Sequence, residues 1–295
     1  MRFKLLAIDL DGTLLAKGGS VSARNRAAID SARAAGMRVV VCTGRGLKES
    51  KEALDAIGRV DPVVTAGGSI IADPHTSETI HRFAIDRDIV HDTIDLLHEF
   101  KYPALVLKDP VAAGYDYFVA HGAEQHPLDP VTEWWFEKMN VHVRTGEHSH
   151  HDEHPEHTVR VGACGLASHL DDVMSSLAKS VGDRAVMHHF PAVVAPEHAS
   201  RLPSGDTLHI LEMFHVDANK WSAVSMLAGK WGIEPSQVVA IGDEINDMSM
   251  ISNAGLGIAM GNAIPVIKAA AKRTTLANHE DGVAHALDRV LGGEW

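Results

Sequence analysis

The stretch FKLLAIDLDGTL, residues 3–14, is the strongest indication of fold and chemistry in this sequence. Residues 3–8 predict a short buried strand, because a brief apolar run turns directly into a polar loop. Asp9 and Asp11 follow that run. Ligands of an open parallel sheet bind beyond the carboxyl ends of its strands, so these two carboxylates stand where a functional site is expected.

Strands alternate with helices in the residues that follow. Ser22 predicts the N-cap of a helix of about a dozen residues, and Gly36 predicts its end. Arg38–Cys42 and Val63–Thr65 are predicted strands, and the helix between them is expected to end near Gly58. This alternation predicts right-handed βαβ units and a parallel sheet covered by helices on both faces.

The pattern changes after residue 83 and returns near Asp217. Between these points, helices are predicted at residues 88–100 and 166–180, and strands at 102–107, 158–164, 184–189 and 207–213. Strands at 237–241 and 256–259 resume the first pattern. We therefore predict an α/β fold. Its Rossmann-like parallel-sheet core is formed by residues 1–83 and 213–295, and an α+β domain is inserted at 84–212.

Composition excludes several functional classes. The chain has 295 residues, 39 acidic and 27 basic side chains, and a net charge of -12. This length favours two domains, and this acidity argues against nucleic-acid binding, which needs a positive field. The apolar runs are too short for a membrane span, and residues 1–8 lack a secretion signal, so we expect a cytoplasmic protein without a membrane partner. Nothing in the sequence specifies an oligomeric state.

The two carboxylates after the first strand crowd like charge into one place. Such crowding costs free energy unless a cation is bound, and oxygen ligands suit a hard ion such as Mg²⁺. The alternative is that Asp9 and Asp11 only cap a turn next to Gly12. A second acidic cluster, GDEIND at residues 242–247, also follows a predicted strand, and one helical turn there would bring Asp243 near Asp247.

Phosphate-binding groups are predicted at two further points. Thr43 and Gly44 follow a strand, so a hydroxyl and backbone N–H groups can hold a phosphate oxygen. Lys220 opens a helix, where its ammonium and the helix N-terminus both favour an anion. The alternatives are a helix cap for Thr43, a surface lysine for Lys220 and an exposed helix acid for Asp247. Because four strand-end or helix-start placements agree, we favour a functional site over these separate alternatives.

These four segments resemble the motifs of the haloacid dehalogenase (HAD) superfamily of phosphatases. The resemblance rests on DLDGTL at 9–14, Thr43-Gly44-Arg45, Lys220 and GDEIND at 242–247. The large insert between the second and third motifs is similar to Cof-type members with a class IIB cap. Further similarity lies in Met260-Gly261-Asn262-Ala263 and in residues 280–284, EDGVA.

The resemblance implies a Mg²⁺-dependent phosphatase for a small phosphorylated metabolite, such as a sugar phosphate. Asp9 would be the nucleophile that forms an aspartyl-phosphate, and Asp11 would act as general acid and base. The inserted domain would be a cap that sets substrate specificity. The implied metal group is Asp9, Asp11 through its backbone carbonyl, Asp243 and Asp247, and the implied phosphate-binding group is Thr43, Gly44, Lys220 and Asn246.

Two departures from the family pattern affect the surroundings of the pocket. Cof-type sequences usually have Asn-Gly-Ala after the third strand, whereas this chain has Ala66-Gly67-Gly68. The family lysine is usually followed by glycine, whereas here Trp221 follows Lys220. Neither departure removes a catalytic group, and both leave the substrate undefined.

Two other functions fit parts of the sequence. A phosphomutase of the phosphomannomutase type shares a similar core and cap, and it would keep phosphate on the sugar. A non-catalytic metal-binding protein is suggested by the histidines, because seventeen of the twenty lie between His81 and His215. The intact Asp9 and Asp11 argue against this second alternative.

The histidines are densest in residues 146–157, which we call the histidine loop. Five of them stand close together: His148, His150, His151, His154 and His157. Imidazole suits Zn²⁺ or Ni²⁺, but the irregular spacing and the surplus of ligands argue against one defined tetrahedral site. We prefer the interpretation of a solvated loop and keep a metal site as the alternative.

Overall fold

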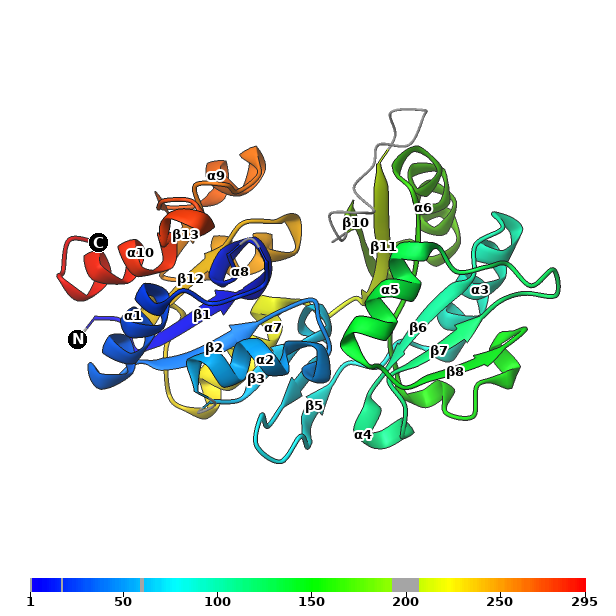
Figure 1. Cartoon of the computed structure of the whole chain (residues 1–295), viewed down its shortest axis with the longest axis horizontal. Helices are drawn as coiled ribbons and strands as arrows, with labels where there is room; N and C mark the ends of the chain where they lie inside the picture. The colour runs from blue at the N-terminus through cyan, green and yellow to red at the C-terminus, as the bar shows by residue number, and fades with distance from the viewer. Residues whose placement is uncertain (1, 17, 59–60, 193–206) are drawn as a thin grey trace. The chain divides into compact units, whose positions relative to one another are not determined.

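A computed structural model describes residues 2–16, 18–58, 61–192 and 207–295, and the chain forms two units (Figure 1). The first unit combines Met1–His81 with Asn219–Trp295, and the second is Arg82–Ala218. The mixed α/β fold with a parallel-rich sheet confirms the predicted fold class. None of the helices in the described ranges is both long and apolar enough to cross a membrane.

The first unit is built on an eight-stranded sheet. In spatial order its strands are β14 (Arg273–Thr274), β13 (Leu256–Ala259), β12 (Val238–Gly242), β1 (Leu5–Asp9), β2 (Arg38–Cys42), β3 (Val63–Thr65), β4 (Ile70–Ala72) and β5 (Thr79–Arg82). The strands from β14 to β3 are parallel, and β4 runs antiparallel to β3. β1 is central, and its residues Leu5, Leu6 and Ile8 are fully buried, as expected of a strand covered on both faces.

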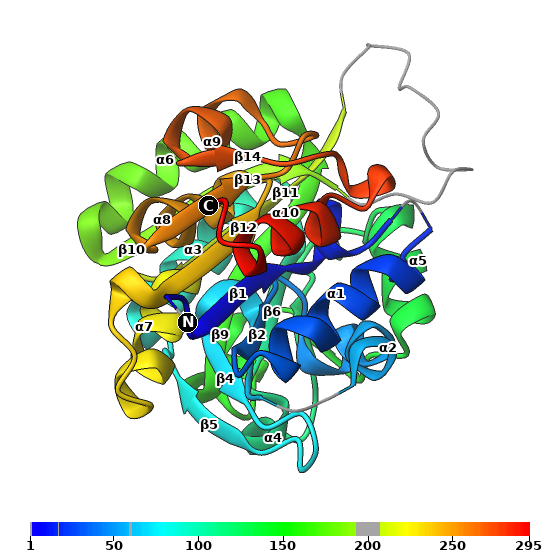
Figure 2. The ribbon, with the colours of Figure 1, turned by 90° about the vertical axis from the view of Figure 1, so that its left-hand side faces the viewer.

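Helices cover both faces of this sheet (Figure 2). One face carries α1 (Ala23–Ala34), α2 (Leu47–Ile57) and α10 (Gly282–Leu291), and the other carries α7 (Lys220–Lys230), α8 (Met248–Asn253) and α9 (Pro265–Ala270). Ser22 caps α1 as predicted, because its hydroxyl accepts a hydrogen bond from the Asn25 N–H at 3.0 Å. The result is a doubly wound core whose strands point their carboxyl ends to one edge.

The second unit is built on a six-stranded sheet, and two helices cover one face of it. In spatial order its strands are β10 (Ala185–Pro191), β11 (Leu208–His215), β9 (Thr158–Leu166), β6 (Ala104–Lys108), β7 (Tyr117–Ala120) and β8 (Val143–Gly146). The helices α3 (Arg87–Glu99) and α6 (Ala167–Val181) pack on this sheet, and the unit also contains α4 (Pro110–Ala113) and α5 (Pro130–Met139). The strands are antiparallel except for the pair β7 and β8.

The limits of the two units differ by a few residues from the predicted domain boundaries. The prediction returned the chain to the core at residue 213, inside β11. That strand continues to His215, which pairs with Ala185 of β10, so hydrogen bonding keeps residues 213–215 in the second unit. The functional role predicted for this unit, a cap, stays a prediction.

A buried ion pair fixes the histidine loop to the sheet of the second unit. Lys108 ends β6 with a fully buried side chain, and its ammonium bonds to Asp152 and, at 2.7 Å, to the Thr158 hydroxyl. The Tyr115 hydroxyl donates to the other oxygen of Asp152 at 2.6 Å. Burial lowers the pKa of Lys108, and the bond to Asp152 opposes that shift. The buried ammonium and carboxylate would each lose a hydrogen-bond partner if the other were removed.

Loss of one member of this pair should destabilise the protein. Lys108→Met leaves the buried Asp152 carboxylate without its counter-ion, which is expected to lower the free energy of unfolding by about 3–5 kcal/mol. The double variant Lys108→Met/Asp152→Leu removes both charges, so its free energy of unfolding is expected to fall by less. Urea unfolding of the parent and the two variants measures these differences. A Lys108→Met protein as stable as the parent would contradict it.

Candidate active site

Four predicted motifs meet at the carboxyl edge of the first unit's sheet. Asp9 is the last residue of β1, Thr43 follows β2, and Asp243 follows β12. Because β1 lies between β2 and β12 in a parallel arrangement, these three chain segments are neighbours. Lys220 is the first residue of α7 and reaches the same place.

Lys220 links two of the carboxylates. Its ammonium is 2.6 Å from Asp9 Oδ1 and 2.6 Å from Asp247 Oδ1. It also lies 3.4 Å from Asn246 Oδ1. Burial by itself lowers the pKa of Lys220, but Asp247 and Asp9 outweigh burial, so this pKa lies above its ordinary value. Lys220 and Asp247 are fully buried, so neither is the solvated surface residue of the alternative interpretation.

Three carboxylates converge beside this lysine. Asp9, Asp243 and Asp247 each offer an oxygen, and these oxygens lie within 4.8 Å of one another. Burial raises the pKa of Asp9 well above its usual range; Lys220 opposes this, and Asp247 and Asp243 add repulsion. Burial, followed by the charge of Asp247, raises the pKa of Asp243 to about 7. Buried, mutually repelling oxygen ligands fit a hard divalent ion such as Mg²⁺.

Two glycines allow these carboxylates to approach. Gly12 has a φ of +76°, and a Cβ added there would lie 2.1 Å from Asp243 Oδ2. A Cβ on Gly242 would lie 2.5 Å from Asp247 Cγ. Asp247 Oδ2 accepts hydrogen bonds from the N–H groups of Asp243, at 2.9 Å, and Glu244, at 3.1 Å. Asp247 therefore braces the loop after β12 as well as contacting Lys220.

Asp11 lies outside this carboxylate group and is held by Arg45. Arg45 Nε donates to Asp11 Oδ2 at 2.7 Å, and Arg45 Nη2 donates to the other oxygen. Burial lowers the pKa of Arg45, but the bond and charge of Asp11 outweigh it, and this pKa is raised. The Asp11 side chain keeps 37% of its surface exposed. The structure thus brings Asp11 to the site edge as a paired, accessible carboxylate.

The predicted phosphate-binding residues lie around the same edge. Thr43 is buried, and its hydroxyl accepts a hydrogen bond from the Arg45 N–H at 3.1 Å. It is not the cap of α2, because Gly46 occupies that position. A Cβ on Gly44 would lie 3.8 Å from Asn246 Nδ2, which places Gly44 next to Asn246.

Three contacts of the site were not predicted, although the residues stand inside the quoted motifs. Thr13 donates to Asp243 Oδ1 at 2.8 Å, and this bond lowers the pKa of Asp243 against the larger effect of burial. Asn262 Nδ2 donates to the Gly12 carbonyl at 2.8 Å and lies 3.4 Å from Asp243 Oδ2. The pairing of Arg45 with Asp11 is the third.

The two departures from the family pattern pack near the start of α7. Gly68 has a φ of +109°, and a Cβ there would lie 2.1 Å from the carbonyl carbon of Asn219. Glycine at this position lets the loop after β3 contact the residue before Lys220. Trp221 is half-buried and packs against the hydrophobic core of the first unit. Both residues therefore contribute to the surroundings of Lys220 without replacing a site residue.

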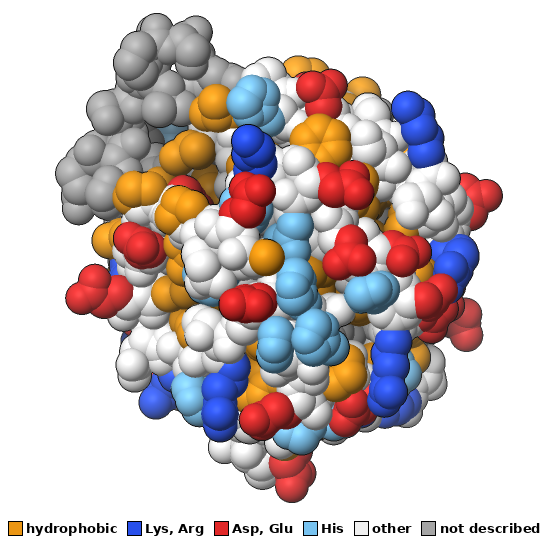
Figure 3. Space-filling model, turned by 90° about the vertical axis from the view of Figure 1, so that its right-hand side faces the viewer, with side chains coloured by type: hydrophobic (Ala, Val, Ile, Leu, Met, Phe, Trp, Pro, Cys, Tyr) orange, Lys and Arg blue, Asp and Glu red, His pale blue; other side chains and the backbone are white. Residues whose placement is uncertain are grey.

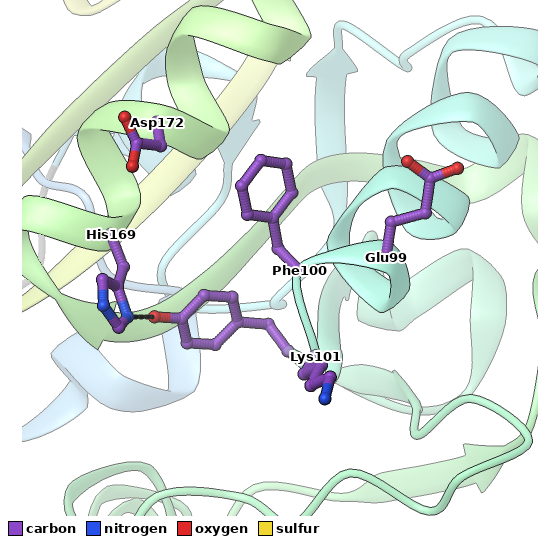
Figure 4. Close-up of a pocket in the computed structure, with 6 residues that line it drawn as sticks. Glu99, Phe100, Lys101, His169 and Asp172 are labelled. Carbon is purple, nitrogen blue, oxygen red and sulfur yellow. Dashed lines mark hydrogen bonds between the residues drawn. The ribbon is translucent and has the colours of Figure 1, made fainter.

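A cavity in the second unit contains none of the predicted site residues. It has a volume of about 290 Å³ and lies between the end of α3 and the start of α6 (Figure 4). Its lining is Glu99, Phe100, Lys101, Tyr102, His169 and Asp172. The Tyr102 hydroxyl lies 3.4 Å from His169 Nδ1. The carboxylate group of the first unit, with its raised pKa values, is the stronger candidate for chemistry.

Comparison with known proteins gives consistent matches over nearly the whole chain. A sequence profile of the haloacid dehalogenase-like hydrolases matches residues 6–287. YxeH, a putative phosphatase of Bacillus subtilis, is 31% identical over 98% of each chain. YwtE, a 5-amino-6-(5-phospho-D-ribitylamino)uracil phosphatase of the same organism, is 31% identical over 99% of each chain.

Solved structures show the same fold. A haloacid dehalogenase-like hydrolase from Bacteroides thetaiotaomicron superposes with a TM-score of 0.76 at 25% identity, over 98% of this chain and 99% of that one. A sugar phosphatase of HAD subclass IIB superposes with a TM-score of 0.77 at 20% identity, over 97% of this chain and 98% of that one.

The raised pKa of Asp243 has a consequence for stability. The folded protein holds this proton to about pH 7, whereas the ordinary pKa is 3.8. Protonation of Asp243 therefore stabilises the folded state at low pH, and this contribution is lost as the pH rises through 7. Asp243→Asn, which cannot ionise, should stabilise the metal-free protein more at pH 8 than at pH 5, by roughly 1–3 kcal/mol.

Thermal and urea unfolding in the presence of a chelator measures this difference. Asp55→Asn, at an exposed position of α2, is the matched control, and its effect on stability is compared with that of Asp243→Asn at each pH. An equal effect of Asp243→Asn at both pH values would contradict the prediction.

Proposed function

The chain belongs to the haloacid dehalogenase-like hydrolases, as a Cof-type phosphatase, and we propose that it cleaves a small phosphorylated metabolite through an aspartyl-phosphate on Asp9. It is a hydrolase of phosphoric monoesters. One observation carries the mechanistic proposal. The Asp9 carboxylate stands at the carboxyl end of β1, oriented by Lys220 and grouped with Asp243 and Asp247.

The proposed reaction has two halves. In the first, a carboxylate oxygen of Asp9 attacks phosphorus, and the bond from phosphorus to the substrate oxygen breaks while Asp11 gives that oxygen a proton. In the second, Asp11 takes a proton from water, the water oxygen attacks phosphorus, and the Asp9 carboxylate is released with inorganic phosphate. Lys220 offsets negative charge in both halves, because its ammonium bonds directly to Asp9.

The proposed cofactor is Mg²⁺. Asp9, the backbone carbonyl of Asp11 and Asp243 would hold it, with Asp247 in support, and the ion would supply positive charge against the phosphoryl oxygens. The fit rests on the oxygen-only donor set and on the raised pKa values of Asp9 and Asp243. Thr43, the N–H of Gly44 and Asn246 are proposed to position the phosphoryl group.

Arg45 fixes the direction of the Asp11 side chain. Its Nε and Nη2 atoms donate to the two oxygens of that carboxyl group, so both oxygens are held at the edge of the site. We therefore propose that Arg45 acts as a positioning residue for Asp11.

We propose that the second unit is a cap that recognises the leaving group of the substrate. Val161 and Met213 face α3 and α6, so the alternate side chains Arg160 and Glu212 stand on the opposite face of the sheet. Arg160 bonds to Glu212, and His188 pairs with Glu212 in register on the same face. The side chains of Arg160 and Glu212 are only 11% and 6% exposed, so we propose that this bonded pair holds the half-buried His188 for contact with a sugar-like phosphomonoester.

Replacement of the nucleophile tests the covalent mechanism. Asp9→Asn keeps the size of the side chain and an oxygen for Lys220, but it removes the attacking carboxylate. We expect Mg²⁺-dependent phosphate release to fall by several orders of magnitude, with an unchanged circular dichroism spectrum. Asp55→Asn is the matched control and should keep full activity. Appreciable turnover by pure Asp9→Asn would exclude the aspartyl-phosphate.

The substrate panel should contain sugar phosphates, pyridoxal phosphate, flavin mononucleotide and 5-amino-6-(5-phospho-D-ribitylamino)uracil, each assayed with and without Mg²⁺. Release of inorganic phosphate supports the phosphatase. An isomeric sugar phosphate without phosphate release would instead identify a phosphomutase.

A substitution in the cap should change substrate choice more than chemistry. We expect His188→Asn to change kcat/KM for the best metabolite of the panel by roughly tenfold, while kcat/KM for p-nitrophenyl phosphate changes much less. His142→Asn, at an exposed position of the same unit, is the control. Equal losses on both substrates would count against a role in specificity.

A further inference from the structure

The structure divides the five clustered histidines of the histidine loop into two sets. The rings of His148, His150 and His151 contact one another. The centroid of the His150 ring lies 5.4 Å from that of His148 and 4.2 Å from that of His151. The rings of His154 and His157 form a separate pair with centroids 5.8 Å apart. The preferred interpretation of the sequence, a solvated loop, did not address how the histidines divide.

Among the residues that the structure describes, a carboxylate comes close to the ring nitrogens of the second set, His154 and His157, and not to those of the first set. Among the described residues, two groups have three or more potential ligand atoms within 4.8 Å of one another. One is the carboxylate group of Asp9, and the other is His154, Glu156 and His157. The second group supplies two imidazoles and one carboxylate, which is a donor set that suits Zn²⁺ and not Mg²⁺.

The distances within this group match the size of such an ion. Glu156 Oε1 lies 3.4 Å from His157 Nε2 and 3.7 Å from His154 Nδ1. Ligands bound tetrahedrally to Zn²⁺ at about 2.0–2.1 Å stand roughly 3.3 Å from one another. The side chains therefore need only small movements to bind an ion.

The backbone that carries these ligands is held in place. The buried ammonium of Lys108 lies 3.2 Å from the His154 carbonyl, and the Asp109 N–H donates to the His157 carbonyl at 2.9 Å. A short turn begins at Pro155, and the His157 N–H closes it on the His154 carbonyl at 3.1 Å. This fixed backbone reduces the ordering that binding requires.

An ion can reach the group from solvent. The side chains of His154 and Glu156 are 39% and 40% exposed. Figure 3 shows histidine side chains gathered on the surface of one face of the molecule, with acidic side chains around them. Arg87 lies 3.4 Å from Glu156 Oε2, so its contact leaves Oε1, the oxygen that faces the imidazoles, for an ion.

We propose that His154, Glu156 and His157 form a Zn²⁺-binding site in the second unit. The site is separate from the carboxylate group of the first unit in both residues and ligand chemistry. The proposal goes beyond the phosphatase function and does not rest on it.

The surroundings of His157 limit the expected affinity. Metal-bound histidines usually donate their second ring N–H to an acceptor. His157 Nδ1 is buried and has no hydrogen-bond partner in the part of the chain that the structure describes. We therefore expect binding in the micromolar range, weaker than that of structural zinc sites.

Calorimetric titration of the full-length protein with Zn²⁺ tests the site. Millimolar Mg²⁺ is present throughout, so that Zn²⁺ does not report on Asp9 and its neighbours. We expect the parent to bind one Zn²⁺ and His154→Gln/His157→Gln to bind it roughly tenfold more weakly or worse. The matched control His150→Gln/His151→Gln removes two histidines of the other set and should keep the parent affinity.

A second variant covers the case in which the double variant does not fold. Glu156→Gln keeps both imidazoles and the shape of the half-exposed side chain, and it should also weaken binding. Absence of Zn²⁺ binding by the parent would overturn the proposal. So would equal losses in His154→Gln/His157→Gln and His150→Gln/His151→Gln, because they would show diffuse binding to the whole histidine loop. Phosphatase activity is not a readout, so failure here is distinguishable from failure of the proposed reaction.

Discussion

The buried ammonium of Lys220 is the contact on which the arrangement of the first unit depends. It binds Asp9 and Asp247, which stand 211 and 27 residues away in sequence, each at 2.6 Å. Removing a lysine and two carboxylates from water carries a large desolvation cost, which close geometry and additional hydrogen bonds must offset. Here the backbone N–H groups of Asp243 and Glu244 also donate to Asp247. The lysine thus orders Asp9, the proposed nucleophile, and the loop after β12 together.

The site is assembled from both ends of the chain. β1 pairs with β2 from the N-terminal segment and with β12 from the C-terminal segment. The N-terminal and C-terminal segments are also linked at the starts of α1 and α10. Asn25 Oδ1 accepts a hydrogen bond from the Ala284 N–H at 3.0 Å, and the Ser22 hydroxyl bonds to Asp281. The core strands β12, β1 and β2 pair with one another without any residue of the segment inserted between β5 and α7. This explains how one sheet can carry an independent second unit.

Sequence reasoning predicted the elements whose patterns are local. The strands Arg38–Cys42, Val63–Thr65 and Leu256–Ala259 were predicted to the residue, because each is a short apolar run between turn residues. β7 and β8 were not predicted. Each has four residues, and β8 has no apolar alternation, since Arg144 and Thr145 are both exposed. Their pairing depends on tertiary contacts with residues that lie far away in the sequence, so a short stretch of sequence does not reveal it.

The same limit applies to the candidate site. Asp9, Thr43, Lys220 and the 242–247 loop could be placed at one sheet edge, because strand ends in a parallel sheet converge. The bond from Arg45 to Asp11 and the bond from Thr13 to Asp243 depend on side-chain directions, which spacing alone does not give. The roles of all these residues in catalysis remain predictions.

The pKa of Asp243 near 7 ties ion uptake to the acidity of the medium. Because burial raises this pKa, the metal-free protein keeps a proton on this carboxyl at pH values where an ordinary aspartate is ionised. A cation that binds there needs the carboxylate, so binding expels a fraction of a proton into the solvent. The heat of binding then includes the ionisation enthalpy of the buffer that takes up the proton. The apparent affinity for the ion rises with pH until the Asp243 carboxyl is fully ionised.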